Sequence, residues 1–154
     1  MGVKALFLDR DGVINEDTGY VFKQEDFRFV DGIFELCRTA MRKGYIIIVA
    51  TNQSGIERGY FSEDQYQALT QWMLARFKEE GVTITEVFHC PTLSGPDRKP
   101  SPGMFLAAQK KYGIDMAASV SLGDKERDIQ AAQQAGVGKN LLLTTDLKEM
   151  EGVL

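Results

Sequence analysis

The sequence has few cysteines, no long hydrophobic run and no excess of positive charge, and each absence excludes a class of protein. Its two cysteines, Cys37 and Cys90, are too few for a disulfide framework, so we expect both to be packing residues. The apolar run Ala5–Leu8 is too short for a signal-peptide core, and no stretch is long enough to span a bilayer. A formal net charge of -4 disfavours nucleic-acid binding. We therefore expect a cytoplasmic protein with neither nucleic-acid nor membrane partners.

The composition is that of an ordinary globular protein. Hydrophobic residues make up 44% and charged residues 26% of the 154 positions, and neither low-complexity segments nor an obvious repeat interrupts the chain. This length is enough to bury a core without disulfides or structural metals. The sequence predicts one domain over residues 1–154, and we expect a monomer.

Short apolar segments alternate with segments of helical periodicity along the chain. Residues 3–8, 45–50, 86–90, 119–122 and 141–143 have the length and character of strands. This alternation predicts an α/β fold, a three-layer sandwich with a central, mainly parallel five-stranded sheet and no large cap domain. In such sheets the ligand site lies at the carboxyl ends of the strands.

Capping residues mark the helices between these strands. Asp31 can cap a helix that runs to about Lys43, and Ser62 with Gln65 has the form of a capping box. Ser101 and Pro102 have the pattern of a cap and first helical residue, and Gly136 follows the last predicted helix.

Two carboxylates follow the first predicted strand. Asp9 closes that strand and Asp11 comes two residues later, so in extended backbone both side chains project to the same side. Gly12 allows a sharp turn directly after them and leaves room for a phosphate close to the backbone. The two acids can therefore share one metal ion or one substrate.

The other predicted strands also end in polar residues. The second is followed by Thr51, Asn52, Gln53 and Ser54, the third by Arg98 and Lys99, and the fourth by Gly123, Asp124 and Lys125, with Asp128 one helical turn beyond. Each signal alone is typical of a solvated loop or turn. Their order at the ends of successive strands nevertheless indicates a single site.

This set of side chains suits phosphomonoester hydrolysis, which needs an in-line nucleophile, neutralisation of oxygen charge and a proton for the leaving alkoxide. Asp9 would attack phosphorus, and Asp11 would act as general acid and base. Asp124, Asp9 and the Asp11 backbone carbonyl would hold Mg²⁺, which suits all-oxygen ligands. Thr51 and Lys99 would stabilise the transferring phosphoryl group.

Four sequence motifs resemble those of the haloacid dehalogenase superfamily: DRDGVIN from Asp9, TNQSG from Thr51, RKPSPGM from Arg98 and GDKERDIQAA from Gly123. The segments DTGYVF, TNQSGIERGYF and IDMAAS further resemble the D-glycero-D-manno-heptose 1,7-bisphosphate phosphatases of bacterial heptose synthesis. The resemblance implies a Rossmann-like haloacid dehalogenase fold and removal of the 7-phosphate of that sugar, for ADP-heptose synthesis. It also implies a substrate site lined by Asp17, Thr18, Gly19, Tyr20, Asn52, Gln53, Ser54, Arg98 and Lys125.

The chain departs from this family in one loop. The family commonly has a zinc loop before the RKP motif, with a Cys-x-His pair and a Cys-x-Cys pair, but here the segment reads HCPTLSGPDRKP. Thr92 stands where the histidine is expected and both later cysteines are missing. Because His89 and Cys90 cannot complete a four-ligand site, we expect no zinc.

Several alternatives remain at this point. A histidinol-phosphate phosphatase shares the same motifs, and other small sugar phosphates also suit a phosphatase without a cap. A phospho-acceptor signalling domain uses similar residues, but an acid two residues after the nucleophile favours hydrolysis. A noncatalytic relative is disfavoured because every motif residue is present. Arg98 could instead be a solvated loop residue, Lys125 could pair with a nearby carboxylate, and Tyr20 could simply pack.

Overall fold

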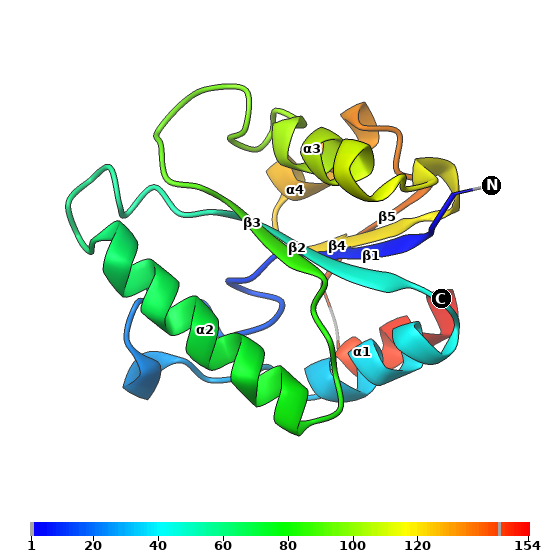
Figure 1. The fold of residues 1–154 in the computed structure, drawn as a ribbon, viewed down its shortest axis with the longest axis horizontal. Helices are drawn as coiled ribbons and strands as arrows, with labels where there is room; N and C mark the ends of the chain where they lie inside the picture. Colours follow the sequence, from blue (N-terminus) through cyan, green and yellow to red (C-terminus); the bar gives the residue numbers. More distant parts are fainter. Residues whose placement is uncertain (1, 145) are drawn as a thin grey trace.

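The computed structural model, which describes residues 2–144 and 146–154, has a parallel sheet between two layers of helices (Figure 1). The strands are β1 (Ala5–Leu8), β2 (Ile46–Asn52), β3 (Glu86–Cys90), β4 (Val120–Gly123) and β5 (Lys139–Leu142). They lie in the order β3-β2-β1-β4-β5, and all neighbouring pairs are parallel. The predicted three-layer α/β sandwich with a five-stranded sheet is confirmed.

Helices cover both faces of the sheet. The α-helices are α1 (Ile33–Arg42), α2 (Glu63–Glu79), α3 (Gly103–Tyr112) and α4 (Glu126–Gln134), and the short 3-10 helices are η1 (Gln24–Asp26), η2 (Met116–Ala118) and η3 (Leu147–Val153). Figure 1 shows α1, α2 and η3 on one side of the sheet and α3 with α4 on the other. Two separate clusters of buried hydrophobic residues fill the spaces between these layers.

Strand β1 connects both layers because it is buried on both faces. Leu6 and Leu8 belong to the core under α1 and α2, whereas Ala5 and Phe7 belong to the core under α3 and α4. All four are at most 1% exposed. This follows from the period of two along a strand, which sends successive side chains to opposite faces.

Two predicted helix starts are wrong in detail. Helix α1 is preceded by Gly32 with φ 90°, so Asp31 is not the N-cap. Helix α3 begins at Gly103 with Pro102 as its N-cap residue, one position later than predicted. The capping box of α2 is confirmed, because Ser62 and Gln65 exchange both expected hydrogen bonds.

The chain order makes the site position a consequence of topology. From β1 the chain builds β2 and β3 on one side, and then returns to build β4 and β5 on the other. The carboxyl ends of β1 and β4 therefore flank the point where the winding direction reverses, which is where open α/β sheets bind ligands.

Two further expectations concern the cysteines and the membrane. Cys37 and Cys90 are both buried as free thiols, and burial raises the pKa of the Cys37 thiol to about 12, which leaves it unreactive. Within the described ranges, no helix has the length and apolar character needed to cross a membrane.

Candidate active site

Asp9 lies directly after β1, at the centre of the carboxyl edge of the sheet. Its Oδ1 accepts a hydrogen bond from the Arg10 backbone N–H at 2.9 Å and lies 3.3 Å from Lys99 Nζ. Only 12% of the side chain is exposed. Burial raises the pKa of Asp9 to about 7, against the opposing effect of Lys99 and with a further increase from Asp128, Asp11 and Asp124.

Lys99 is a buried cation between two carboxylates. Its Nζ lies 2.9 Å from Asp128 Oδ1 and 3.3 Å from Asp9 Oδ1, and its side chain is 2% exposed. Burial alone would lower the pKa of Lys99, but the two carboxylates outweigh that effect and raise it. The backbone of Lys99 is fixed by the Asn52 side chain, which accepts the Lys99 N–H at 3.0 Å and donates to the Lys99 carbonyl at 3.2 Å.

Asp11 is oriented by three neighbouring donors. Arg10 donates to Asp11 Oδ1 from Nε at 3.2 Å and from a terminal nitrogen at 2.9 Å, and Asn15 donates to the same oxygen at 3.0 Å. Gln53 donates to the other oxygen at 2.9 Å and also to the Thr51 hydroxyl at 3.0 Å. Arg10 is only 1% exposed and also donates to the Val21 carbonyl. Because its own position is fixed in this way, Arg10 fixes the orientation of the Asp11 carboxylate.

Three carboxylates at the sheet edge are close enough to share a cation. One oxygen each from Asp9, Asp124 and Asp128 lie within 4.8 Å of one another. Asp124 Oδ1 is buried without a hydrogen-bond partner, so an atom other than a protein donor is needed to satisfy it. An all-oxygen ligand set of this kind fits Mg²⁺ and not zinc.

The backbone around these carboxylates leaves no spare room. A Cβ atom on Gly12, whose φ is +94°, would lie 2.0 Å from Asp124 Oδ2. A Cβ on Gly123 would lie 2.3 Å from the Asp128 Cβ. Both glycines are therefore needed for close approach of the backbone to the acids.

The Asp11 side chain is engaged by Arg10, Asn15 and Gln53 and not by the other acids. Ligation of a metal ion by the Asp11 backbone carbonyl stays a prediction.

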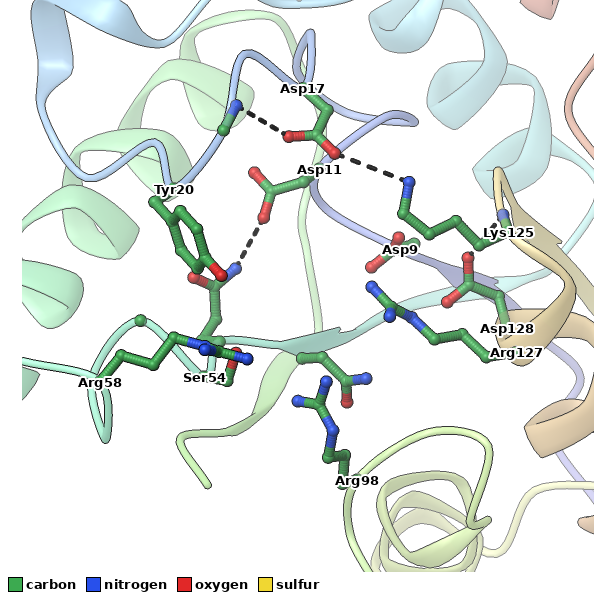
Figure 2. Close-up of a pocket in the computed structure, with 14 residues that line it drawn as sticks. Asp9, Asp11, Asp17, Tyr20, Ser54, Arg58, Arg98, Lys125, Arg127 and Asp128 are labelled. Atoms are coloured by element: carbon green, nitrogen blue, oxygen red, sulfur yellow. Dashed lines mark hydrogen bonds and ion pairs between the residues drawn. The ribbon is translucent and has the colours of Figure 1, made fainter. Parts of the chain in front are cut away.

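A cavity of about 290 Å³ opens above these acids. It is lined by Asp9, Asp11, Asp17, Gly19, Tyr20, Asn52, Gln53, Ser54, Gly55, Arg58, Arg98, Lys125, Arg127 and Asp128. Figure 2 shows that the side chains of Arg58, Arg98 and Arg127 reach toward the same space as Asp9 and Asp11. The cavity therefore combines acids with several cations that can bind an anionic ligand.

Most predicted site residues meet at this cavity. Four predicted site residues do not line it: Thr51 and Lys99, which are buried, Asp124, which is partly buried, and Thr18, which is exposed. Lys125 lies 3.8 Å from Asp17 Oδ2 and 3.6 Å from Asp124 Oδ2, so it pairs with carboxylates as one alternative anticipated.

Tyr20 occupies an unusual backbone conformation at the rim of the cavity. It has φ +47°, the left-handed region that few non-glycine residues adopt, and its ring packs edge-on against Tyr60 at 4.7 Å. Its side chain both lines the cavity and packs, so the two readings of this residue are compatible.

The sequence alone did not single out several residues of the site. Arg10 and Asn15 lie in the first motif but act only through the folded turn that brings them to Asp11. Arg58 and Arg127 lie within the quoted segments TNQSGIERGYF and GDKERDIQAA, but both side chains are exposed and neither was assigned a role. Asp128 had a visible signal, because it follows Asp124 by one helical turn, yet its pairing with Lys99 required the tertiary structure.

The residues around the expected zinc position do not fit that metal. His89 stacks on Tyr66 of α2 at 4.2 Å and its Nε2 lies 2.9 Å from Glu63 Oε1. Cys90 packs in the core on the opposite face of the sheet, with its Sγ 3.2 Å from Thr92 Oγ1. Consecutive strand residues point to opposite faces, so these two side chains cannot ligate one ion.

Comparison with known protein families gives one partial match. A family model described as HAD-hydrolase-like matches residues 97–151.

Two curated relatives resemble most of the chain. The D-glycero-alpha-D-manno-heptose-1,7-bisphosphate 7-phosphatase of Burkholderia mallei is 53% identical over 150 residues, covering 91% of this chain and 79% of that protein. The D-glycero-beta-D-manno-heptose-1,7-bisphosphate 7-phosphatase of Vibrio cholerae is 46% identical over 155 residues, covering 94% and 83%.

Solved structures agree with this similarity. D,D-heptose 1,7-bisphosphate phosphatase from B. bronchiseptica, in complex with magnesium and phosphate, is 30% identical with a TM-score of 0.85, covering 97% of this chain and 86% of that one. A HAD-like phosphatase from Mesorhizobium loti is 37% identical with a TM-score of 0.84, covering 92% and 72%.

Proposed function

Because the chain belongs to the heptose 1,7-bisphosphate 7-phosphatase family of the haloacid dehalogenase superfamily, we propose that it is a magnesium-dependent phosphatase that forms an aspartyl-phosphate on Asp9. Its substrate is D-glycero-D-manno-heptose 1,7-bisphosphate, from which it removes the 7-phosphate for ADP-heptose synthesis. The observation that carries the proposal is the cluster of Asp9, Lys99, Asp124 and Asp128, two of which, Asp9 and Asp128, line a cavity with several arginines.

In the first step the Asp9 carboxylate attacks phosphorus and the bond between phosphorus and the ester oxygen breaks. Asp11, as the carboxylic acid, gives its proton to the leaving alkoxide, which departs as the sugar hydroxyl. The hydrogen bonds from Arg10 and Gln53 hold the Asp11 carboxyl group in one orientation for this transfer. Lys99, fixed by Asn52, neutralises charge on the transferring phosphoryl oxygens, and the Thr51 hydroxyl donates to them.

In the second step the Asp11 carboxylate takes a proton from a water molecule, and the oxygen of that water attacks the phosphorus of the aspartyl-phosphate. Inorganic phosphate leaves, and both Asp9 as carboxylate and Asp11 as acid are restored. Asp9, Asp124 and Asp128 offer the carboxylates to hold Mg²⁺, together with the predicted Asp11 carbonyl. When bound, Mg²⁺ supplies charge neutralisation for the phosphoryl oxygens.

The cations of the cavity favour a substrate with two phosphates. One phosphate occupies the position next to Asp9, and the other meets Arg98, with Arg58 and Arg127 on the same cavity surface. A guanidinium can bind a phosphate through two parallel hydrogen bonds. The ammonium group of histidinol phosphate would instead meet charges of its own sign, which disfavours that substrate.

The test is magnesium-dependent phosphate release from the alpha and beta anomers of heptose 1,7-bisphosphate and from histidinol phosphate. We expect kcat/KM to be highest for one heptose anomer, and both anomers are needed because the relatives are named for either one. Faster turnover of histidinol phosphate would contradict the proposed substrate while keeping the chemistry. Absence of release from all three would contradict the proposed function. That the protein is a monomer and that it is cytoplasmic both stay predictions.

A further inference from the structure

The segment 91–98 lies between β3 and Lys99 and contributes one residue, Arg98, to the lining of the cavity. We propose that Glu57 is a positioning residue for Arg98, because its contacts tie segment 91–98 to the loop after β2. Hydrogen bonds to the loop after β2 and to the start of α3 hold segment 91–98 in place. The inference rests on the proposed function only in that it assumes a substrate whose second phosphate binds Arg98.

Glu57 contacts the segment in two directions. Its carboxylate Oε2 accepts the Leu93 backbone N–H at 2.5 Å, and its own backbone N–H donates to the Pro91 carbonyl at 3.2 Å. Hydrogen bonds to a carboxylate are shorter and stronger than those between neutral groups. The side chain of Glu57 thus fixes Leu93 and its backbone fixes Pro91, the two residues on either side of Thr92.

Thr92, which lies between these two fixed residues, contacts the Arg98 side chain. The Thr92 carbonyl accepts a hydrogen bond from Arg98 Nη1 at 3.3 Å, and the Thr92 hydroxyl donates to the Ser94 carbonyl at 2.7 Å. At the far end, the Gly103 N–H donates to the Pro96 carbonyl at 2.9 Å, which closes the segment against α3. The guanidinium of Arg98 is therefore held through Thr92, at the point that Glu57 fixes.

Glu57 itself does not line the cavity, whereas its neighbour Arg58 does. The bonds of Glu57 therefore also set the spacing between the segment that carries Arg58 and the one that carries Arg98. They do not touch Asp9, Asp11 or Lys99. Removing the carboxylate should weaken binding of a distal phosphate and leave the chemistry at the first phosphate unchanged.

The experiment compares Glu57→Ala, Glu57→Gln and Glu25→Ala, the last being an exposed glutamate of η1, on two substrates. One substrate is heptose 1,7-bisphosphate and the other is p-nitrophenyl phosphate, which has no second phosphate. For Glu57→Ala we expect KM for the bisphosphate to rise roughly tenfold, with kcat and the rates on p-nitrophenyl phosphate unchanged. Glu57→Gln keeps an acceptor for Leu93 and should restore KM to within about threefold, and Glu25→Ala should match the wild type.

Hydrogen exchange at the Leu93 amide tests the tether without any substrate. We expect faster exchange in Glu57→Ala and near-normal exchange in Glu57→Gln. Unchanged exchange in Glu57→Ala, or an equal loss of activity on both substrates, would overturn the inference. If the wild type does not hydrolyse the bisphosphate, the proposed substrate fails, whereas Leu93 exchange still decides whether Glu57 holds the segment.

Discussion

At the scale of single residues, the protonation of Asp9 affects the stability of the folded protein. Burial raises its pKa from the ordinary value of 3.8 to about 7, although Lys99 opposes the shift. Between these two values the folded chain holds a proton that the unfolded chain has lost, so the contribution of Asp9 to stability falls as pH rises toward 7. Above 7 the folded protein carries a buried charge that the neutral Asp9→Asn variant lacks.

We therefore expect metal-free Asp9→Asn to be more stable than the metal-free wild type at about pH 8, by roughly 1–3 kcal/mol. The difference should shrink as pH falls from about 7 toward 4, because the wild-type carboxyl group is then neutral in the folded state. Urea unfolding in the presence of EDTA measures both proteins. A difference that stays constant with pH would contradict this account of Asp9.

The same proton should compete with magnesium. Since Asp9 has to be ionised to ligate Mg²⁺, metal binding below its raised pKa releases a proton. We expect the apparent Kd for Mg²⁺ to rise roughly tenfold for each pH unit below about 7 and to level off above it. Calorimetry at several pH values checks this, and an affinity independent of pH between about 6 and 8 would exclude Asp9 as a ligand.

Asn52 is expected to act through Lys99 and not only through substrate. Its side-chain amide makes both a donor and an acceptor bond with the Lys99 backbone. Asn52→Ala should lower kcat by about tenfold or more, because Lys99 then loses its fixed position beside Asp9. Asn140→Ala is the control, since Asn140 on β5 also uses both ends of its amide, with Ser121 and Val137. An effect on KM alone would assign Asn52 to substrate binding.

At the scale of elements, the sequence predicts buried segments better than edges. The bounds predicted for β3 agree with the structure, because Pro91 stops the strand. The apolar pattern predicts the last strand at 141–143, but β5 spans Lys139–Leu142. Lys139 and Asn140 are polar residues of an edge strand, which a hydrophobic pattern does not mark. The short helix η3, whose Leu147 is buried, is not predicted from the sequence.

The predicted site depended on the same logic. Acids and donors at strand ends converge because parallel strands end at one edge of the sheet, so Lys99 and Asp124 both lie close to Asp9 there. The roles of these residues stay predictions. Arg58 and Arg127 do not directly follow a strand, and their long side chains bring them to the cavity. Such residues cannot be assigned to the cavity without the tertiary structure. Which carboxylate pairs with Lys99 is likewise a question of distance and not of sequence order.

The turn between β4 and α4 gives a prediction at this scale. In Gly123→Ala the new methyl group would lie 2.3 Å from the Asp128 Cβ, so the start of α4 would have to shift. We expect a loss of about 1–3 kcal/mol in stability and weaker Mg²⁺ binding. Thermal unfolding with and without Mg²⁺ measures both effects. Gly152→Ala is the control, because no atom lies within 4 Å of the added Cβ, and equal behaviour of the two variants would contradict the steric argument.

At the scale of the whole molecule, the reversal of strand order between β1 and β4 assembles the site from distant parts of the chain. Asp9, Lys99 and Asp128 are separated by 90 and 29 positions in sequence, yet the lysine contacts both acids. The same edge carries the cavity with its arginines (Figure 2). The proposed nucleophile, the lysine beside it and the cavity thus lie together as a consequence of one sheet topology.

The most direct test of this account is the rate of Mg²⁺-dependent phosphate release from heptose 1,7-bisphosphate by the wild type, Asp9→Asn and the exposed control Asp26→Asn. We predict that Asp9→Asn loses at least about 10³-fold in kcat, while Asp26→Asn keeps the wild-type rate. Removal of Mg²⁺ should abolish the wild-type activity. If Asp9→Asn retained a rate within about tenfold of the wild type, Asp9 could not be the nucleophile and the central claim would be wrong.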